Sequence, residues 1–246
     1  MSHEPSASPL ILGGAHTPRA ALPQLPPLAL YIHIPWCVRK CPYCDFNSHA
    51  ASPTLPEEEY VDALLADLDQ DLHAVHGREL SSIFFGGGTP SLFSAQALGR
   101  LLKGVEQRIR FAPDIEITLE ANPGTFEQEK FTAYRALGIN RLSIGIQSFQ
   151  EQKLKALGRI HNGDEAIRAA GMARQAGFDN FNLDLMHGLP DQSLDDALGD
   201  LRQAIAMKPT HLSWYQLTLE PNTVFWNQPP VLPEDDTLWD LSLIHI

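Results

Sequence analysis

The sequence contains few cysteines, few basic residues and no long apolar run. Its 246 residues include only three cysteines, an odd number that argues against a disulfide scaffold. Lys and Arg number 18 against 30 Asp and Glu, a net charge of −12, so the basic surface typical of nucleic-acid binding is not expected. No run approaches the roughly 18 apolar residues of a membrane span, which leaves only a peripheral membrane contact open. A content of 43% hydrophobic residues supports a sizeable core.

The two ends differ from the middle in composition. Residues 1–27 are rich in proline and lack both the basic start and the apolar stretch of a signal peptide, so we expect a disordered leader and a cytoplasmic protein. Residues 229–240 are rich in proline and acids. We expect a core domain at 28–226, and we interpret 227–246 as a linker into a further domain, with a loose natural tail as the alternative.

Short β-rich runs alternate with helical runs along the core. Apolar residues recur at helical spacing from Val61 to Leu72, from Leu98 to Ile109 and from Leu194 to Ile205, which puts one apolar stripe on each helix, facing a sheet. Strands alternating with such helices imply parallel βαβ units. Six units predict an α/β fold, either an open partial (βα)6 barrel or a doubly wound sheet, because a closed TIM barrel needs eight. The expected strands are 29–34, 81–85, 115–120, 140–146, 180–186 and 211–217.

Unusual polar and glycine residues fall at the carboxyl ends of successive expected strands. In parallel βα folds these ends share one face, where binding sites are built, so we expect one site there. The expected helix at 56–76 carries seven acids and no Lys or Arg, and we interpret it as a solvated outer face. The residues at the strand ends are the three cysteines, Gly86 to Pro90, Glu120 to Pro123, Gln147, Asp184, Gln216 and Thr218.

All three cysteines lie in the loop after the first strand, spaced Cys-x3-Cys-x2-Cys at Cys37, Cys41 and Cys44. Thiolates are soft ligands that suit zinc or an iron–sulfur cluster. A structural zinc site needs a fourth ligand, which here would be His33 or His49. A 4Fe–4S cluster on three cysteines leaves one iron open for a small molecule. Three unrelated thiols are the remaining interpretation.

The cysteine spacing, together with the run Gly86-Gly87-Gly88-Thr89-Pro90 after the second strand, resembles the radical S-adenosylmethionine superfamily. The resemblance extends over about residues 28–226. It implies an open six-unit (βα)6 partial TIM barrel with a 4Fe–4S cluster on the three cysteines. It also implies that S-adenosylmethionine binds the open iron and is cleaved to a 5′-deoxyadenosyl radical when a reductant supplies an electron.

The resemblance further implies which residues bind S-adenosylmethionine. The glycines admit close backbone approach to its methionine end. Glu120 accepts hydrogen bonds from the ribose or the amine, Gln147 and Asp184 serve the ribose, and Arg159 pairs with the carboxylate. Tyr31 packs near the cluster. The implied cofactor-binding residues are Tyr31, Gly87, Gly88, Thr89, Glu120, Gln147, Arg159 and Asp184.

Longer motifs such as Tyr-Ile-His-Ile-Pro-Trp-Cys and Asp-Leu-Met-His-Gly-Leu-Pro are similar to the coproporphyrinogen dehydrogenase group. Its oxygen-independent dehydrogenases, which act in porphyrin biosynthesis, have a further cysteine two positions after the third cluster cysteine. Phe46 stands there and favours the group's haem chaperones, which bind haem and deliver it to respiratory proteins. The resemblance puts the haem-contacting region after residue 246, so no haem ligand is named. Decarboxylation of coproporphyrinogen is the alternative hypothesis, and no catalytic residue is assigned.

Overall fold

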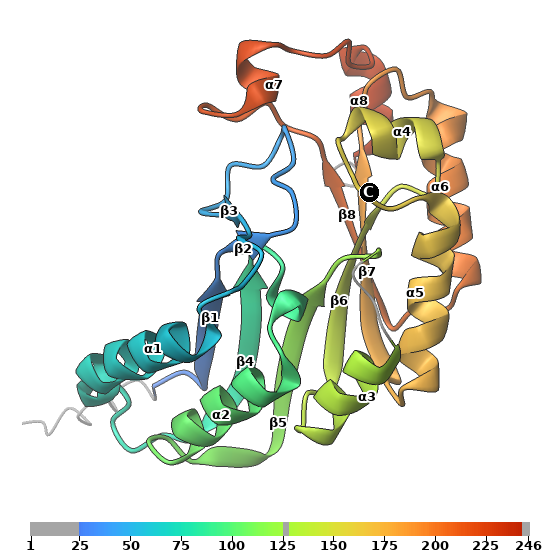
Figure 1. Ribbon diagram of the computed structural model, residues 1–246. Coiled ribbons are helices and arrows are strands. Elements are labelled where there is room, and N and C mark those ends of the chain that lie inside the picture. The colour runs from blue at the N-terminus through green and yellow to red at the C-terminus, as the bar shows by residue number, and fades with distance from the viewer. Residues whose placement is uncertain (1–24, 125–127, 243–246) are drawn as a thin grey trace, which may run out of the picture.

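The centre of the molecule is a sheet of six parallel strands (Figure 1). The computed structural model describes residues 25–124 and 128–242, so the expected leader lies almost wholly outside the described residues. The six expected strands are confirmed, each overlapping an observed one. They are β1 (Leu28–Ile34), β4 (Leu80–Gly87), β5 (Phe111–Ala121), β6 (Arg141–Gln147), β7 (Asn180–His187) and β8 (His211–Gln216).

The spatial order of these strands follows their order along the chain, β1-β4-β5-β6-β7-β8, and every neighbouring pair is parallel. A doubly wound sheet contains a point at which the strand order reverses. The sheet formed by the described residues has no such point, so the open partial barrel is confirmed over the doubly wound alternative. All six strands therefore end at one edge, where the expected site residues come together.

Helices connect successive strands and cover the outer face of the sheet (Figure 1). None of the helices in the described ranges has the length and apolar composition that crossing a bilayer requires. The five connecting helices are α1 (Glu57–Asp71), α2 (Ala95–Glu106), α3 (Gln128–Ala136), α5 (Gly163–Gln175) and α6 (Leu194–Ala206). The shorter elements are β2 (Trp36–Cys37), β3 (His49–Ala50), η1 (Leu72–Ala74), η2 (Pro90–Leu92), α4 (Glu151–Ala156), α7 (Val224–Asn227) and α8 (Asp235–Leu241).

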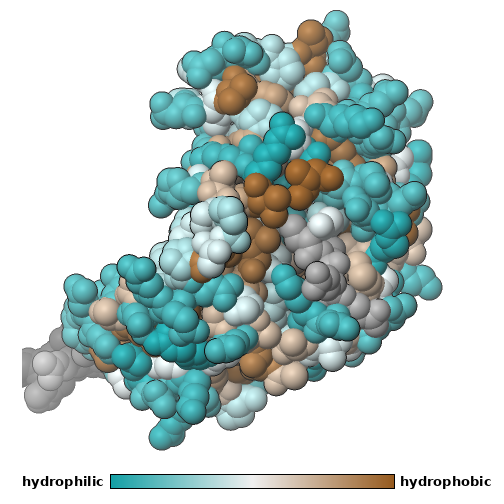
Figure 2. Space-filling view, viewed as in Figure 1, coloured by the Kyte–Doolittle hydropathy of each residue, from teal (hydrophilic) through white to brown (hydrophobic). Residues whose placement is uncertain are grey.

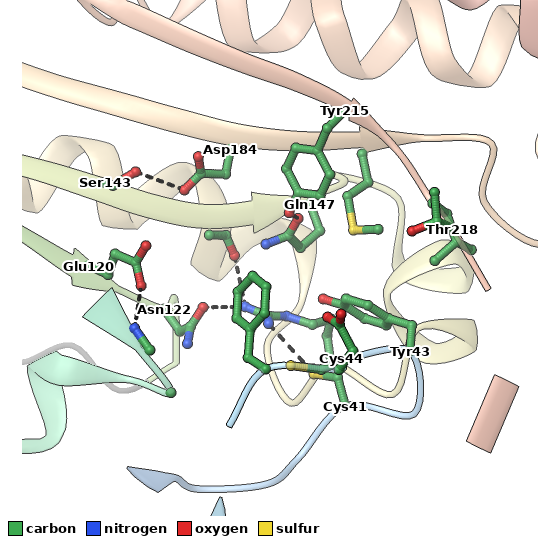
Figure 3. A pocket seen from close by; sticks show the side chains of 18 of the residues that line it. Cys41, Tyr43, Cys44, Glu120, Asn122, Ser143, Gln147, Asp184, Tyr215 and Thr218 are labelled. Carbon is green, nitrogen blue, oxygen red and sulfur yellow. Dashed lines mark hydrogen bonds between the residues drawn. The ribbon is translucent and has the colours of Figure 1, made fainter. Parts of the chain in front are cut away.

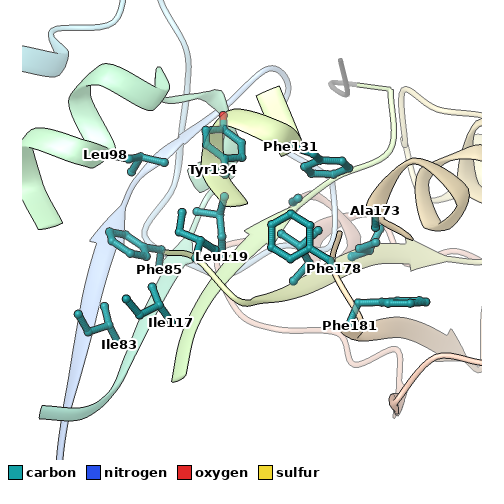
Figure 4. Close-up of a cluster of buried hydrophobic side chains, with 14 of the residues drawn as sticks. Ile83, Phe85, Leu98, Ile117, Leu119, Phe131, Tyr134, Ala173, Phe178 and Phe181 are labelled. Carbon is teal, nitrogen blue, oxygen red and sulfur yellow. The ribbon is translucent and has the colours of Figure 1, made fainter. Parts of the chain in front are cut away.

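The core lies between the outer face of the sheet and these helices (Figure 4). Ile83 and Phe85 of β4 and Leu119 of β5 are 0–1% exposed, as are Leu98 of α2 and Tyr134 of α3. Burying side chains of this size contributes roughly 1.5–3 kcal/mol each. The Tyr134 hydroxyl is satisfied as well, because it donates to the backbone oxygens of Ser91 within η2 and of Phe93 directly after it. This layer fixes the sheet that carries the site.

The apolar stripe expected on α6 is wrong at both ends. Leu194 is 41% exposed and Ile205 57% exposed, whereas Ala197 and Ala204 are fully buried. Asp200 is also buried on that face, and its carboxylate accepts hydrogen bonds from the loop after β6. The inward face of α6 is therefore centred on small residues and one acid, which a search for large apolar side chains misses.

The acidic helix α1 is solvated, as expected, but some of its acids also bind α2. Arg100 contacts Glu58 and Asp62, and Arg108 forms a two-bond pair with Asp69. These side chains remain exposed to solvent, so each pair stabilises the fold only slightly. In the space-filling view, the lobe that carries α1 and α2 is covered mainly by hydrophilic side chains (Figure 2).

Candidate functional site

The carboxyl ends of the strands surround a cavity of about 430 Å³, within the usual range of small-molecule sites. Its wall contains residues from every expected group, namely the cysteine loop, the glycine run, β5, β6, β7 and the segment after β8. Figure 3 shows the thiols of Cys41 and Cys44 with the Tyr43 ring at one end, and Glu120 and Asp184 toward the other. These groups share one cavity at this edge, and its role as a binding site stays a prediction.

The cysteine loop is held against the sheet by backbone hydrogen bonds. Residues of β2 pair with β3, which closes the loop on itself. The Thr89 N–H donates to the Trp36 oxygen at 2.7 Å, and the Gly88 N–H donates to the Ile34 oxygen at 2.8 Å. All three cysteines are free thiols of intermediate exposure. Burial raises the pKa of the Cys37 thiol, and hydrogen bonds from Thr89 and Ser48 oppose that rise.

The glycine run lets β4 approach this loop closely. A Cβ atom on Gly88 would lie 2.6 Å from the Trp36 oxygen, and one on Gly87 would lie 2.7 Å from the His33 ring. The φ angle of Gly87 is also 120°, which L side chains rarely adopt. The visible reason for these glycines is thus packing within the chain. Both also line the cavity, and close approach to a cofactor remains a prediction.

Two partly buried carboxyl groups, those of Glu120 and Asp184, face the cavity, and neither forms a salt bridge within the described part of the chain. Burial and, to a smaller extent, the nearby Asp184 raise the pKa of Glu120 to about 7, against the opposing effect of the Gly87 N–H at 3.3 Å. Burial also raises the pKa of Asp184, against hydrogen bonds from Ser143, Ser213 and Asn182. A cationic or hydroxyl-rich ligand would supply the partners that these carboxylates lack.

Arg159 lies at the cysteine end of the cavity. Its Nη2 donates to Asn122 Oδ1 at 2.6 Å and to the Gly145 oxygen at 2.8 Å, and its Nη1 approaches Cys41 Sγ at 3.7 Å. The remaining donor, Nε, is buried and has no partner among the described residues. An unpaired buried donor is costly, so this atom suits an acceptor group on a bound molecule.

Gln147 ends β6 in an unusual backbone conformation, with a φ angle of +67°. Non-glycine residues adopt this region rarely, and such strain is concentrated at functional sites. The Gln147 side-chain oxygen accepts a hydrogen bond from the Tyr215 hydroxyl of β8. The left-handed turn therefore aims the amide into the cavity and leaves its nitrogen available to a ligand.

Three of the expected residues do not line this cavity. Tyr31 is 57% exposed on the edge strand β1, where its hydroxyl bonds His33 Nδ1 at 3.0 Å. Thr89 and Cys37 lie beyond the wall, with Thr89 in a small adjacent hollow shared with Cys41 and Arg159. The remaining eight expected residues, two cysteines and six cofactor-binding candidates, all line the cavity. They are Cys41, Cys44, Gly87, Gly88, Glu120, Gln147, Arg159 and Asp184.

The structure adds residues to which the sequence reasoning gave no role. Tyr43, Asn122 and Tyr215 line the cavity. Asn122 was visible as a polar residue at a strand end, next to Glu120. Tyr43 and Tyr215 gave no such signal, because an aromatic residue in a loop or an edge strand is equally typical of a core position.

The cysteines suit a cluster better than a single ion. Across residues 25–124 and 128–242, no three His, Cys, Asp or Glu side chains converge on one metal position. An iron–sulfur cluster does not require its thiolates to meet at one metal ion, because they bind different irons. Three free thiols, the unpaired Arg159 Nε and the carboxyl groups of Glu120 and Asp184 also fit a zwitterionic ligand beside a cluster.

Comparison with known proteins agrees with this geometry. Residues 31–204 match the family described as the Radical SAM superfamily. The chain is 63% identical over 218 residues to a protein of Escherichia coli named heme chaperone HemW, and 59% identical over 224 residues to the protein of that name from Haemophilus influenzae. Each match covers 89% of this chain and 58% of the relative, so the chain spans little more than half of these relatives' length.

A solved structure extends the comparison to the fold. The Escherichia coli protein described as coproporphyrinogen III oxidase (HemN), a radical SAM enzyme, superposes with a TM-score of 0.78 and 30% identity. The superposition covers 87% of this chain and 50% of that one. The superposition therefore takes in most of this chain and half of the solved one.

Proposed function

Because the chain belongs to the radical S-adenosylmethionine superfamily, we propose that Cys37, Cys41 and Cys44 hold a 4Fe–4S cluster and that the adjoining cavity binds S-adenosylmethionine. When bound, the pair supplies one-electron chemistry. The chain's own residues provide binding, orientation and exclusion of water. We further propose that residues 28–226 form this core domain in the cytoplasm and that a reductant supplies the cluster with electrons.

The polar groups of the cavity fit the ends of S-adenosylmethionine. Arg159, with its free Nε, would pair with the carboxylate of the methionine moiety. Glu120 and Asp184 would accept hydrogen bonds from the ribose or the amine, and Gln147 would donate its amide N–H to the ribose. Thr89 and Tyr31 would act from outside the wall, by holding the cysteine loop and by packing beside Gly86.

For the whole protein, we propose a haem chaperone that binds haem as cargo and delivers it to respiratory haemoproteins. The observation that carries this proposal is the 63% identity to a protein named heme chaperone HemW over 89% of this chain. Phe46 supports it, because the decarboxylating type resembled by the sequence has a cysteine at this position. The Phe46 side chain is 59% exposed and lines the cavity.

The alternative is oxygen-independent dehydrogenation of coproporphyrinogen III. The observation that favours it is the superposition with the solved coproporphyrinogen III oxidase at a TM-score of 0.78. The lower identity of 30% and the aromatic residue at position 46 make it the second candidate.

The experiment compares haem binding with turnover in the same preparation of the anaerobically reconstituted full-length protein. We expect saturable haem binding in a Soret titration and no loss of coproporphyrinogen III when S-adenosylmethionine and a reductant are present. The control variant Cys41→Ala should lose the cluster's visible absorbance and most of its iron while its far-ultraviolet circular dichroism is unchanged, because no spare cysteine exists. Turnover of coproporphyrinogen would establish the alternative, and absence of both activities would contradict haem carriage by this chain.

A further inference from the structure

A continuous line of side-chain hydrogen bonds runs along the wall of the cavity and is centred on Asn122, directly after β5. The Asn122 amide nitrogen donates to Thr89 Oγ1 at 2.8 Å. Its amide oxygen accepts from Arg159 Nη2 at 2.6 Å. One amide thus joins the end of β4 to the segment after α4, and Figure 3 shows it pointing toward the guanidinium group beside Cys41.

The two ends of this line reach two different cysteines. At one end, Arg159 Nη1 donates toward Cys41 Sγ at 3.7 Å. At the other end, the Thr89 backbone N–H is bonded to the Trp36 oxygen at 2.7 Å, which fixes Thr89 next to Cys37. The Thr89 side chain is close enough to the Cys37 thiol to lower its pKa, as a hydrogen-bond donor does.

The chemistry of the amide sets the direction of every bond in the line. Thr89 Oγ1 accepts from the Asn122 nitrogen, so its single hydroxyl hydrogen is free to donate to Cys37. The Asn122 oxygen accepts from one arm of the guanidinium group, which turns another arm to Cys41. Both sulfur atoms therefore receive a donor, and reversing the amide would break this pattern.

The packing around the amide preserves this arrangement. Gly145 faces Asn122, and a Cβ atom at that position would lie 2.6 Å from Asn122 Oδ1 and 3.5 Å from Arg159 Nη2. A side chain there would push the amide and the guanidinium group apart. The Gly145 oxygen also accepts from Arg159 Nη2 at 2.8 Å, so the arginine is aligned on both sides.

We propose that Asn122 is a positioning residue that keeps the Thr89 hydroxyl and the Arg159 guanidinium group as donors to Cys37 and Cys41, and that it thereby raises the reduction potential of the cluster. This inference rests on the proposed function, because it requires the cluster. Donors to ligand sulfur stabilise the more negative, reduced state, and hydrogen bonds of this kind are among the factors that set cluster potentials.

The test is a potentiometric titration of the reconstituted cluster, followed by electron paramagnetic resonance without S-adenosylmethionine. Asn122→Leu keeps a similar size and removes both hydrogen bonds. We expect its midpoint potential to fall by up to about 59 mV, which corresponds to a tenfold change in the one-electron equilibrium constant. Thr89→Val should cause a smaller fall because only the Cys37 branch is lost, and Thr89→Ser should restore the wild-type potential.

The outcomes separate this inference from the proposed function. Failure of the wild-type chain to assemble a cluster would contradict the proposed function. Full iron content in Asn122→Leu with an unchanged midpoint would overturn the role of Asn122. If Asn122→Leu loses iron, the Thr89→Val and Thr89→Ser pair decides. Equal potentials in those two variants would then reject the inference.

Discussion

At the scale of single residues, Glu120 and Asp184 dominate the electrostatics of the cavity. Burial raises the pKa of both carboxyl groups, and the nearby Asp184 adds to the rise at Glu120. The free protein therefore holds a proton at Glu120 up to a pH of about 7. Ionisation of Glu120 therefore reduces the stability of the free folded protein.

The pKa of Glu120 predicts how stability depends on pH. Between its ordinary value of 4.5 and about 7, the folded state retains a proton that the unfolded chain has released, so stability contributed by the neutral carboxyl is lost as the pH rises through 7. Glu120→Gln should leave the free energy of unfolding nearly unchanged at pH 4.5 and raise it by up to about 3 kcal/mol at pH 8. Urea denaturation of the cluster-free protein at both pH values measures this.

A matched control lies on the same strand. Glu116 of β5 is exposed, and Glu116→Gln should change stability by less than about 0.5 kcal/mol at either pH. If Glu120→Gln is no more stabilising at pH 8 than at pH 4.5, the pKa of Glu120 is not raised in the folded protein.

Site residues could be predicted from the sequence where a polar or charged side chain interrupts a pattern that is otherwise apolar. Glu120 and Asp184 interrupt apolar strands, and Arg159 follows a glycine, so each could be named. The position of Tyr31 outside the cavity could not be foreseen. Whether the side chain of an edge strand points into the barrel or along its rim depends on neighbours far away in sequence, such as Phe84 and His33.

At the scale of elements, the site depends on the junction of β6 with α6. Asp200 of α6 is 2% exposed, and its carboxylate accepts from Ser148 Oγ at 2.6 Å and from the Phe149 N–H at 2.9 Å. Ser148 directly follows Gln147, whose left-handed conformation ends β6. The acid on the helix thereby fixes the turn that aims Gln147 into the cavity.

Removing this junction should destabilise the whole fold. Asp200→Ala leaves the Ser148 hydroxyl and the Phe149 N–H buried without acceptors, at a cost of about 2–4 kcal/mol. Asp200→Asn retains one acceptor and should lose less. The exposed Asp195 of the same helix is the control, and Asp195→Ala should cost less than about 1 kcal/mol. Guanidinium denaturation compares the three, and equal losses at positions 195 and 200 would contradict the junction.

Helix and strand positions were predictable because apolar spacing was regular along the chain. The orientation of α6 was mistaken for a physical reason. Its packing against the sheet uses Ala197 and Ala204, which allow close approach, and the buried Asp200, whereas Leu194 and Ile205 lie at its exposed edge. An acid satisfied by partners 50 residues away in sequence has no local signature.

At the scale of the whole molecule, the segment after the six strands contacts the barrel. The Trp214 Nε1 of β8 donates to the Leu241 oxygen at 3.0 Å, and the Asp191 N–H donates to the Val231 oxygen at 3.1 Å. A Cβ atom on Gly188 would lie 2.7 Å from the Leu238 side chain. The expected linker at 227–246 thus includes α8, which is packed on the core that we place at 28–226.

These contacts predict that α8 stabilises the barrel. The Leu241 side chain is 4% exposed, so Leu241→Ala should cost about 2–3 kcal/mol through lost burial and a residual cavity. For a chain of this length, that loss lowers the unfolding temperature by about 4–12 °C. Val231→Ala is the matched control, because the Val231 side chain is 73% exposed and its truncation should change the temperature little. Thermal unfolding followed by circular dichroism measures both variants.

If Leu241→Ala melts at the same temperature as the wild type, α8 does not belong to the cooperative unit and the core domain ends near residue 226. If it melts several degrees lower in a single transition, the cooperative unit extends through residue 241 and supports the carboxyl edge of β7 and β8, where Asp184 and Tyr215 lie.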